Sequence, residues 1–312
     1  MTTETPSQPP IPSSQSPASV RWPRPDNVLR LRDNRLLGYA EYGAPTGYPV
    51  IFFHGMPGSR LEGALGRESA TRENIRLVVP DRPGYGLSDF KPKRRILDWA
   101  DDVVELADAL GFDRFAIAGI SGGGPYVAAC ALRIPHRLTG AAIISGVGPF
   151  EAPGATDGMS RQNRALFGMA RRVPPLARAS LSAMSMIATR WPRRAMAQMK
   201  RAMPPPDRAV LEQPGISDGF VENIAESFRS GSRGATWEAQ LYAKPWGFRL
   251  EDIAMEVHVW QGGKDVNVAP SMGRYQAQAI PNSKLTFYEE EGHLLGITHL
   301  DEILSTVTSS RA

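Results

Sequence analysis

The sequence predicts an α/β protein in which a mostly parallel sheet carries helices on both faces. Two observations indicate this class. Short apolar runs such as "VIFF" at 50–53 and "FAIAGI" at 115–120 have the composition of strands buried on both sides. They alternate with stretches whose apolar residues recur at helical spacing, an order typical of parallel sheets. At 312 residues, the chain is long enough to bury one large core.

The first half of the chain presents these elements in a regular order. "RLLGYAEYG" predicts an edge strand, "PVIFFHG" a buried strand, and "IRLVVP" a second buried strand that leads into the glycine-rich "DRPGYGLSD". The segment 96–111 predicts a helix, because its apolar residues lie three or four positions apart and Gly111 can cap its end. A strand, a helix and a strand follow in "RFAIAGIS", "GPYVAACALRI" and "LTGAAIISGV".

This rhythm breaks between about 146 and 247, where no strand is predicted and arginines are interleaved with most of the methionines. Strands resume in "EVHVWQGGKD" and "SKLTFYEEEGH". We therefore expect residues 28–148 and 247–312 to form the sheet core and residues 149–246 to form a helical insertion that caps it. Residues 1–27 are rich in Pro and Ser, which predicts a disordered tail.

Composition narrows the class of protein. The tail has no apolar block that could act as a signal peptide, and no other segment is long and apolar enough to cross a bilayer. The single cysteine, Cys130, excludes an intramolecular disulfide and is interpreted as a buried thiol. The net charge of +4 is modest, and no motif for nucleic acid is present. These features predict a cytoplasmic protein that binds neither nucleic acid nor, by stable insertion, a membrane.

The arginines and methionines of the insertion have two interpretations. In the functional one, methionines line an adaptable pocket and arginines attract an anionic substrate or a membrane surface. In the structural one, which we favour, the arginines are the solvated face of helices whose methionines pack on the core.

Ser121 is the candidate nucleophile. It stands in "GISGG", which fits G-x-S-x-G, the motif of a tight turn between a buried strand and a helix. Alone, a match to three fixed positions is weak evidence, because such a match can arise by chance. The predicted strand before the motif and the predicted helix after it strengthen the interpretation. Because a serine hydroxyl is a weak nucleophile, the site also needs a general base and a group that orients it.

His293 is the best candidate base. It follows the last predicted strand in "EEEGH", at the sheet edge where the loop of Ser121 also lies. His136 ends the helix after Ser121, His258 lies within a strand, and His299 lies too far into the next helix.

Asp265 is the candidate acid. It leaves the penultimate strand in "QGGKD", and a carboxylate there would orient the imidazole and stabilise its protonated form. The alternative, that Asp265 is only a turn residue, is weakened by its order and spacing after Ser121. Glu289, Glu290 and Glu291 are interpreted as a solvated rim.

Two backbone N–H groups are candidates for binding an oxyanion. Gly122 follows the nucleophile, and Met56 lies in the "HGMPGSR" loop after the first buried strand.

With these residues assembled, the chain resembles the α/β-hydrolase superfamily from about Arg35 to its last helix. "HGMPG", "DRPGYGLSD", "GISGGG", "GGKD" and "EGH" carry the resemblance, in the order the superfamily has them. It implies an α/β-hydrolase fold with a helical cap, the triad Ser121, Asp265 and His293, the oxyanion donors Met56 and Gly122, and no metal or organic cofactor. "DRPGYGLSD" is interpreted as structural, with Asp81 and Arg82 capping a tight turn.

Departures from named subfamilies narrow the activity. Epoxide hydrolases and haloalkane dehalogenases use aspartate where Ser121 stands. Proline iminopeptidases typically carry glycine at Met56 and tryptophan at Gly122, which puts peptidase activity in doubt.

The leading hypothesis is a serine hydrolase that cleaves a carboxylic ester of a small, partly apolar molecule through an acyl-enzyme. A carbon–carbon bond hydrolase, lactonase, thioesterase, iminopeptidase-like enzyme or cofactor-free perhydrolase would use the same triad. A non-catalytic ligand-binding protein on this fold is the alternative from another class. The sequence does not indicate an oligomeric state.

Overall fold

The computed structural model describes residues 26–309, so the predicted tail lies almost wholly outside it. Within these residues, eight strands form one sheet in the order β1-β2-β4-β3-β5-β6-β7-β8. β1 and β2 are antiparallel to their neighbours, and every pair from β4 to β8 is parallel. The strands are β1 (Asn27–Arg30), β2 (Leu36–Gly43), β3 (Tyr48–Phe53), β4 (Ile75–Pro80), β5 (Phe115–Ile120), β6 (Leu138–Ile144), β7 (Val257–Gly262) and β8 (Ser283–Tyr288). The predicted α/β class is confirmed, with one difference: "RLLGYAEYG" forms β2, and β1 takes the edge beside it.

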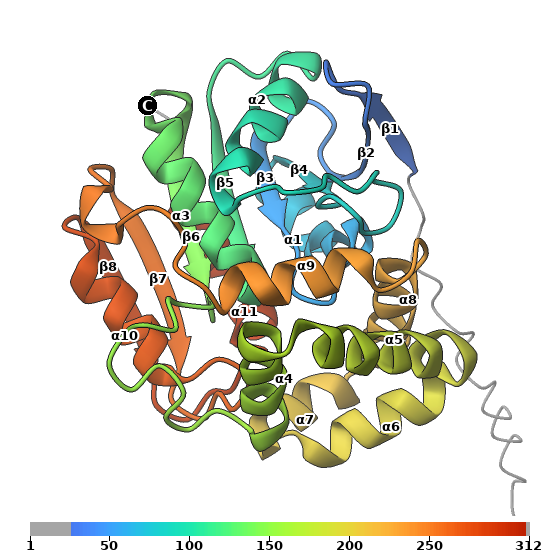
Figure 1. The fold of residues 1–312 in the computed structure, drawn as a ribbon. Helices are drawn as coiled ribbons and strands as arrows, with labels where there is room; N and C mark the ends of the chain where they lie inside the picture. Colours follow the sequence, from blue (N-terminus) through green and yellow to red (C-terminus); the bar gives the residue numbers. More distant parts are fainter. Residues whose placement is uncertain (1–25, 310–312) are drawn as a thin grey trace, which may run out of the picture.

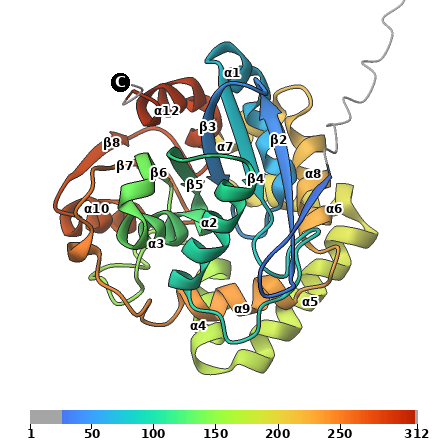
Figure 2. The same ribbon diagram turned by 90° about the horizontal axis from the view of Figure 1, so that it is seen from above.

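Helices cover both faces of the sheet (Figure 2). α2, α3 and α10 pack on one face, and α1 and α12 pack on the other. Their bounds are α1 (Arg67–Arg72), α2 (Trp99–Ala109), α3 (Gly124–Arg133), α10 (Pro270–Ala279), α11 (Leu295–Thr298) and α12 (Leu300–Val307).

The core alternates along each central strand. On β3, Ile51 and Phe53 join the core cluster on one face, whereas Val50 and Phe52 join the cluster on the other face. This alternation explains the uninterrupted apolar runs of the sequence, because a strand covered on both faces needs apolar side chains at every position. Because β3, β5, β6, β7 and β8 are paired in parallel, β3, β5, β7 and β8 all end at the same edge of the sheet.

Six helices lie between β6 and β7 in the described chain (Figure 1). They are α4 (Arg161–Arg172), α5 (Pro174–Arg190), α6 (Pro192–Ala202), α7 (Pro205–Glu212), α8 (Ile216–Ser227) and α9 (Arg233–Tyr242). We call residues 161–242 the helical insertion.

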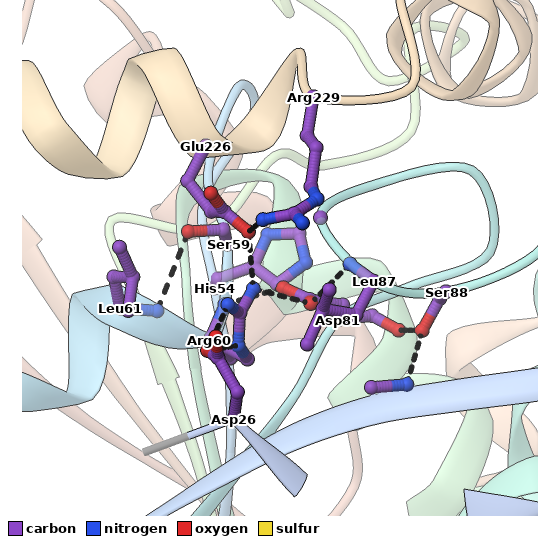
Figure 3. A network of polar contacts seen from close by, with 12 residues as sticks. Asp26, His54, Ser59, Arg60, Leu61, Asp81, Leu87, Ser88, Glu226 and Arg229 are labelled. Atoms are coloured by element: carbon purple, nitrogen blue, oxygen red, sulfur yellow. Dashed lines mark hydrogen bonds and ion pairs between the residues drawn. The ribbon is translucent and has the colours of Figure 1, made fainter. Parts of the chain in front are cut away.

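Buried polar contacts attach α8 to the loop after β3 (Figure 3). Arg60 is fully buried and donates to Asp81 Oδ2 at 3.0 Å and to Glu226 Oε1 at 2.7 Å. Beside it, the backbone N–H and the hydroxyl of Ser59 both donate to Asn223 Oδ1. Burial raises the pKa of Asp81 to about 6, although Arg60 opposes the shift. The insertion is thus joined to the core by ion pairs and hydrogen bonds as well as by apolar packing.

Candidate active site

Ser121 occupies the tight turn between β5 and α3. All six residues of β5 are buried, and Ser121 begins a single 3-10 turn (Ser121–Gly123) that leads into α3. Its φ of 53° lies in the left-handed region, which is uncommon for a non-glycine residue and costs free energy. The half-buried side chain therefore lies at the carboxyl edge of the sheet, on the sharp turn that the G-x-S-x-G motif predicts.

The glycines around Ser121 are required by close backbone packing. A Cβ at Gly123 would lie 2.3 Å from the carbonyl oxygen of Phe53, which no side chain can accept. A Cβ at Gly122 would lie 2.8 Å from Met56 Cβ and 3.3 Å from the Met56 backbone nitrogen. The loop after β3 and the turn after β5 are therefore in contact, and this contact places the backbone of Met56 beside that of Gly122.

Asp265 and His293 form a buried pair. His293 Nδ1 lies 2.8 Å from Asp265 Oδ2, and the two side chains come from the loops after β8 and β7. Asp265 Oδ1 accepts the backbone N–H groups of Asn267 and Val268 at 2.8 and 2.9 Å, and Gln261 Nε2 donates to Oδ2 at 3.3 Å. These bonds hold the carboxylate in place, so its Oδ2 accepts the Nδ1 proton and the other ring nitrogen of His293 keeps its lone pair.

The electrostatic surroundings raise the pKa of His293. Burial by itself would lower the pKa of the imidazole, but the charge and hydrogen bond of Asp265 raise the pKa above its usual value. Asp207 and Glu62 add to this effect through their charges. His293 is therefore a stronger base than an isolated imidazole.

Buried side chains hold the loop that carries Met56 through hydrogen bonds to the backbone carbonyls of that loop. His54 Nδ1 donates to the Gly55 carbonyl at 2.8 Å, and His54 Nε2 accepts the backbone N–H of Arg82 at 3.1 Å. Burial, together with the charge of Arg82, lowers the pKa of His54 well below its usual value, so this histidine is neutral. Arg82 then donates to the carbonyls of His54 and Gly55. Arg82 is therefore more than the turn cap expected from the sequence, because its guanidinium supports the loop of Met56.

Glu238 of α9 stands at the centre of these contacts. Its carboxylate is fully buried and accepts hydrogen bonds from Arg82 Nε at 2.7 Å, Arg94 Nη2 at 3.0 Å and Tyr85 Oη at 2.8 Å. Burial would raise the pKa of Glu238, but the charges of Arg82 and Arg94 hold it far below its usual range. The network therefore contains a permanent carboxylate between two guanidinium groups, all shielded from water.

Tyr242, also on α9, connects this network to the turn of Ser121. Its hydroxyl lies 2.9 Å from Glu238 Oε2 and 2.7 Å from the carbonyl oxygen of Gly122. The loop that carries Met56 and the turn of Ser121 are thus both held by groups in contact with Glu238: Arg82 binds the loop and Tyr242 binds the turn.

Two further buried carboxylates near His293 were missed by sequence reasoning. Asp207, at the start of α7, accepts the backbone N–H of Leu294 at 2.8 Å, and Glu62 accepts that of Gly55 at 2.9 Å. Burial raises the pKa of both, although the charge of His293 opposes the rise. No local pattern marks either residue, because a lone acidic side chain in a helix is usually solvated.

The structure does not bring His258, His299 or Cys130 into this site. His258 on β7 lies beside Glu256, His299 stacks on Tyr288, and Cys130 is buried within α3. Within residues 26–309, no group of three or more His, Cys, Asp or Glu side chains is arranged to hold a metal ion. In the same range, no helix has the length and apolar character that crossing a membrane requires.

Comparison with known proteins places these features in a family. A family model described as the alpha/beta hydrolase fold matches residues 48–300. A 2-hydroxymuconate semialdehyde hydrolase from Pseudomonas putida is 31% identical over 108 residues, 33% of this chain and 37% of that protein. A proline iminopeptidase from Xylella fastidiosa is 32% identical over 117 residues, 36% of each chain. The match therefore spans little more than a third of these curated relatives.

A crystal structure of an esterase from a Rhodococcus species is similar to nearly the whole fold. Its TM-score is 0.66 at 20% sequence identity, and the match covers 92% of this chain and 99% of the esterase. At this identity, the likeness supports the fold.

The Glu238 network generates a prediction about stability. Glu238→Gln keeps the size of the side chain but leaves Arg82 and Arg94 without their buried counter-charge, so we expect the free energy of unfolding to fall by about 3–5 kcal/mol. Urea denaturation followed by circular dichroism measures the change. Glu212→Gln, at an exposed end of α7, is the matched control and should stay within about 0.5 kcal/mol of the original chain. Equal stabilities of the two variants would contradict this account.

The Asp265–His293 pair generates a prediction about protonation. Asp265→Asn removes the negative charge that opposes the effect of burial, so the pKa of His293 should move downward. NMR titration of isotope-labelled histidine measures this pKa, with the His293 signal assigned by its loss in His293→Gln. Asp113→Asn, an exposed change, is the control and should leave the value unchanged. An identical His293 pKa in both aspartate variants would refute the assigned cause.

Proposed function

Because the chain belongs to the α/β-hydrolase family, we propose that it is a serine hydrolase that cleaves a carboxylic ester through an acyl-enzyme. One observation carries the proposal. A buried carboxylate–imidazole pair, Asp265 and His293 at 2.8 Å, lies at the sheet edge where Ser121 occupies a left-handed turn. The family uses this order of residues along the chain, nucleophile, acid and then base.

In the proposed first step, Ser121 Oγ attacks the carbonyl carbon of the ester, and its proton passes to the free ring nitrogen of His293, Nε2. Asp265 stabilises the imidazolium that forms, because its Oδ2 keeps the hydrogen bond to Nδ1 throughout. The tetrahedral intermediate collapses with cleavage of the bond to the leaving alcohol, which takes the proton from His293.

In the second step, His293 takes a proton from a water molecule, whose oxygen attacks the acyl group on Ser121. The proton returns to Ser121 Oγ, and the carboxylic acid leaves. We assign the stabilisation of both tetrahedral oxyanions to the backbone N–H groups of Met56 and Gly122, which belong to loops in contact. Preorganised donors of this kind need stiff support, and the contacts of Arg82 and Tyr242 fit that requirement.

We propose that the helical insertion caps the site. The support for this role is that α7 reaches the loop of His293 through Asp207, and α9 reaches the turn of Ser121 through Tyr242. A substrate held between the insertion and the sheet edge would be a small molecule, because contacts on both sides leave little room for a polymer.

The same mechanism can act on more than one class of bond. A carbon–carbon bond, lactone, thioester or peracid reaction would use the same three residues. The relatives, a hydrolase and an iminopeptidase by name, differ in substrate, and the similar Rhodococcus structure is named an esterase. A non-catalytic ligand-binding protein is disfavoured, because neither Ser121, Asp265 nor His293 is replaced.

Ser121→Ala tests the proposal. The original chain should react with a fluorophosphonate probe and hydrolyse p-nitrophenyl acetate, and Ser121→Ala should lose the label and at least about 10⁴-fold in rate. Ser305→Ala, an exposed serine on α12, is the control and should behave as the original chain. If the original chain neither reacts with the probe nor hydrolyses esters of any chain length, the ester-hydrolase assignment fails.

Gly122→Ala tests the oxyanion assignment. The added methyl group would lie 2.8 Å from Met56 Cβ and 3.0 Å from the Tyr242 hydroxyl, so it must push the two donor loops apart. We expect kcat to fall by about 10²–10³-fold with a smaller change in KM, because the donors act mainly on the transition state. Gly168→Ala on α4, where an added Cβ would lie at an ordinary contact distance of 3.7 Å from Arg172 Nη1, should keep the original kcat. An unchanged kcat in Gly122→Ala would remove Gly122 from the proposed mechanism.

A further inference from the structure

The charges of the chain are strongly segregated. Residues 158–206 contain ten basic residues and no Asp or Glu. Since the whole chain has 36 basic and 32 acidic residues, the rest of it holds 26 basic and 32 acidic residues and is net negative. The ten basic residues, which lie on α4, α5 and α6, are Arg161, Arg164, Arg171, Arg172, Arg178, Arg190, Arg193, Arg194, Lys200 and Arg201. We call the solvent-facing side of these three helices the basic face.

The arginines of the basic face are exposed, and residues 26–309 provide them with no counter-charge. All nine are solvent-exposed, and within the described part of the chain none of the ten basic residues takes part in an ion pair. Elsewhere, exposed arginines often have acidic partners, as Arg72 has in Asp301 at 2.8 Å. An uncompensated field of this size attracts anions over long distances.

An apolar strip lies on the same face. Among residues 26–309, seven large apolar side chains are exposed, and five of them fall between 173 and 191. They follow one another largely at steps of three or four residues along α5 and its ends, with the exposed Ala179 and Ala183 between them, so they share one side of the helix. The five, which are 39% to 58% exposed, are Val173, Leu176, Met186, Ile187 and Trp191.

The strip and the arginines adjoin each other. α5 contacts both α4 and α6, and the three helices lie together at the end of the molecule opposite α2 (Figure 1). A surface groove along α4 is itself mixed, since Arg161, Arg164 and Arg172 line it together with Met169 and Val173. A partner for this face must therefore supply negative charge and an apolar phase side by side.

We infer that the basic face binds the surface of an anionic phospholipid bilayer. Arginine side chains match the phosphate oxygens of the headgroups, and α5 lies in the plane of the interface with its apolar strip in the boundary between headgroups and acyl chains. Trp191 sits at the end of the strip, and tryptophan favours this depth because its ring is apolar with one polar group. The contact is with the membrane surface and does not span it.

Three other occupants fit the face less well. Nucleic acid would satisfy the arginines but leave the apolar strip exposed to water, whereas protein–DNA interfaces are polar. A second copy would bury the strip but bring two uncompensated positive fields together. The chain's own residues 1–25 cannot neutralise the face, because they contain Arg21 and Arg24 against a single acidic residue, Glu4.

Sedimentation of the full chain with vesicles tests the inference, and this measurement needs no catalytic activity. One set of vesicles is phosphatidylcholine alone, and the other is an equal mixture of phosphatidylcholine and phosphatidylglycerol. We expect binding to the mixed vesicles only, weakening as salt is added.

Two double variants separate charge from apolar contact. Arg193→Glu with Arg194→Glu should lower the partition coefficient by at least about 25-fold, since each basic residue near an anionic surface contributes roughly fivefold. Ile187→Ser with Trp191→Ser should lower it by about tenfold or more through lost apolar burial. All four positions are exposed, so the fold should be kept, and circular dichroism checks this.

Matched controls lie away from the basic face. Arg133→Glu with Lys284→Glu gives the same change in net charge, and Leu285→Ser removes an exposed apolar side chain from β8. Both should bind within about twofold of the original chain. The original chain and both controls should also hydrolyse a soluble ester at the same rate, so a failure of membrane binding is distinct from a failure of the proposed function.

Several outcomes would overturn the inference. Two results would contradict it directly: the original chain stays in the supernatant with anionic vesicles at low salt, or the charge control loses binding as strongly as the Arg193 and Arg194 variant. Retention on DNA that persists in the Ile187 and Trp191 variant, without vesicle binding, would identify a nucleic-acid surface. Self-association that this same variant abolishes, again without vesicle binding, would identify an interface between copies of the chain.

Discussion

The buried carboxylate of Glu238, between the guanidinium groups of Arg82 and Arg94, is the interaction on which the rest of the site depends. It joins α9 of the insertion to the loop after β4. Through Arg82 it reaches the carbonyls of His54 and Gly55, and through Tyr242 it reaches the carbonyl of Gly122. The two backbone segments that would bind an oxyanion are thus positioned by one charge cluster, whose members come from distant parts of the sequence.

Burying these charges is costly, and apolar side chains of the same volume would often stabilise a fold as well or better. Such a replacement would leave the carbonyl groups around the Ser121 turn without partners, because an apolar core cannot accept or donate hydrogen bonds. The polar cluster therefore has a directional role that apolar packing cannot supply. Two other loops at the same sheet edge are held by directional hydrogen bonds of this kind. Asp207 accepts the backbone N–H of Leu294, and Asn223 accepts the backbone N–H of Ser59.

The helical insertion consequently has two unlike sides. Its inner side is rich in buried acidic groups, Asp207, Glu226 and Glu238, each bound to a donor of the core. Its outer side carries the uncompensated arginines and the apolar strip of α5. Negative groups facing the core and positive groups facing outward also explain how a segment this basic packs against the sheet without repulsion, because the charged groups on its inner side are acidic.

Local patterns in the sequence determined the fold class, the turn at Ser121 and the edge of the sheet that receives Asp265 and His293. They could do so because strand burial, helical spacing and the steric demands of a glycine-flanked turn act between neighbours in the chain. The outer β1 strand and the partners of Arg82 were not determined in this way. Arg82 and Glu238 are 156 positions apart, and a lone glutamate in a helix looks like any solvated one until topology places it. Only the tertiary structure decided which charges were taken out of water, because desolvation depends on what packs around a group and not on its sequence neighbours.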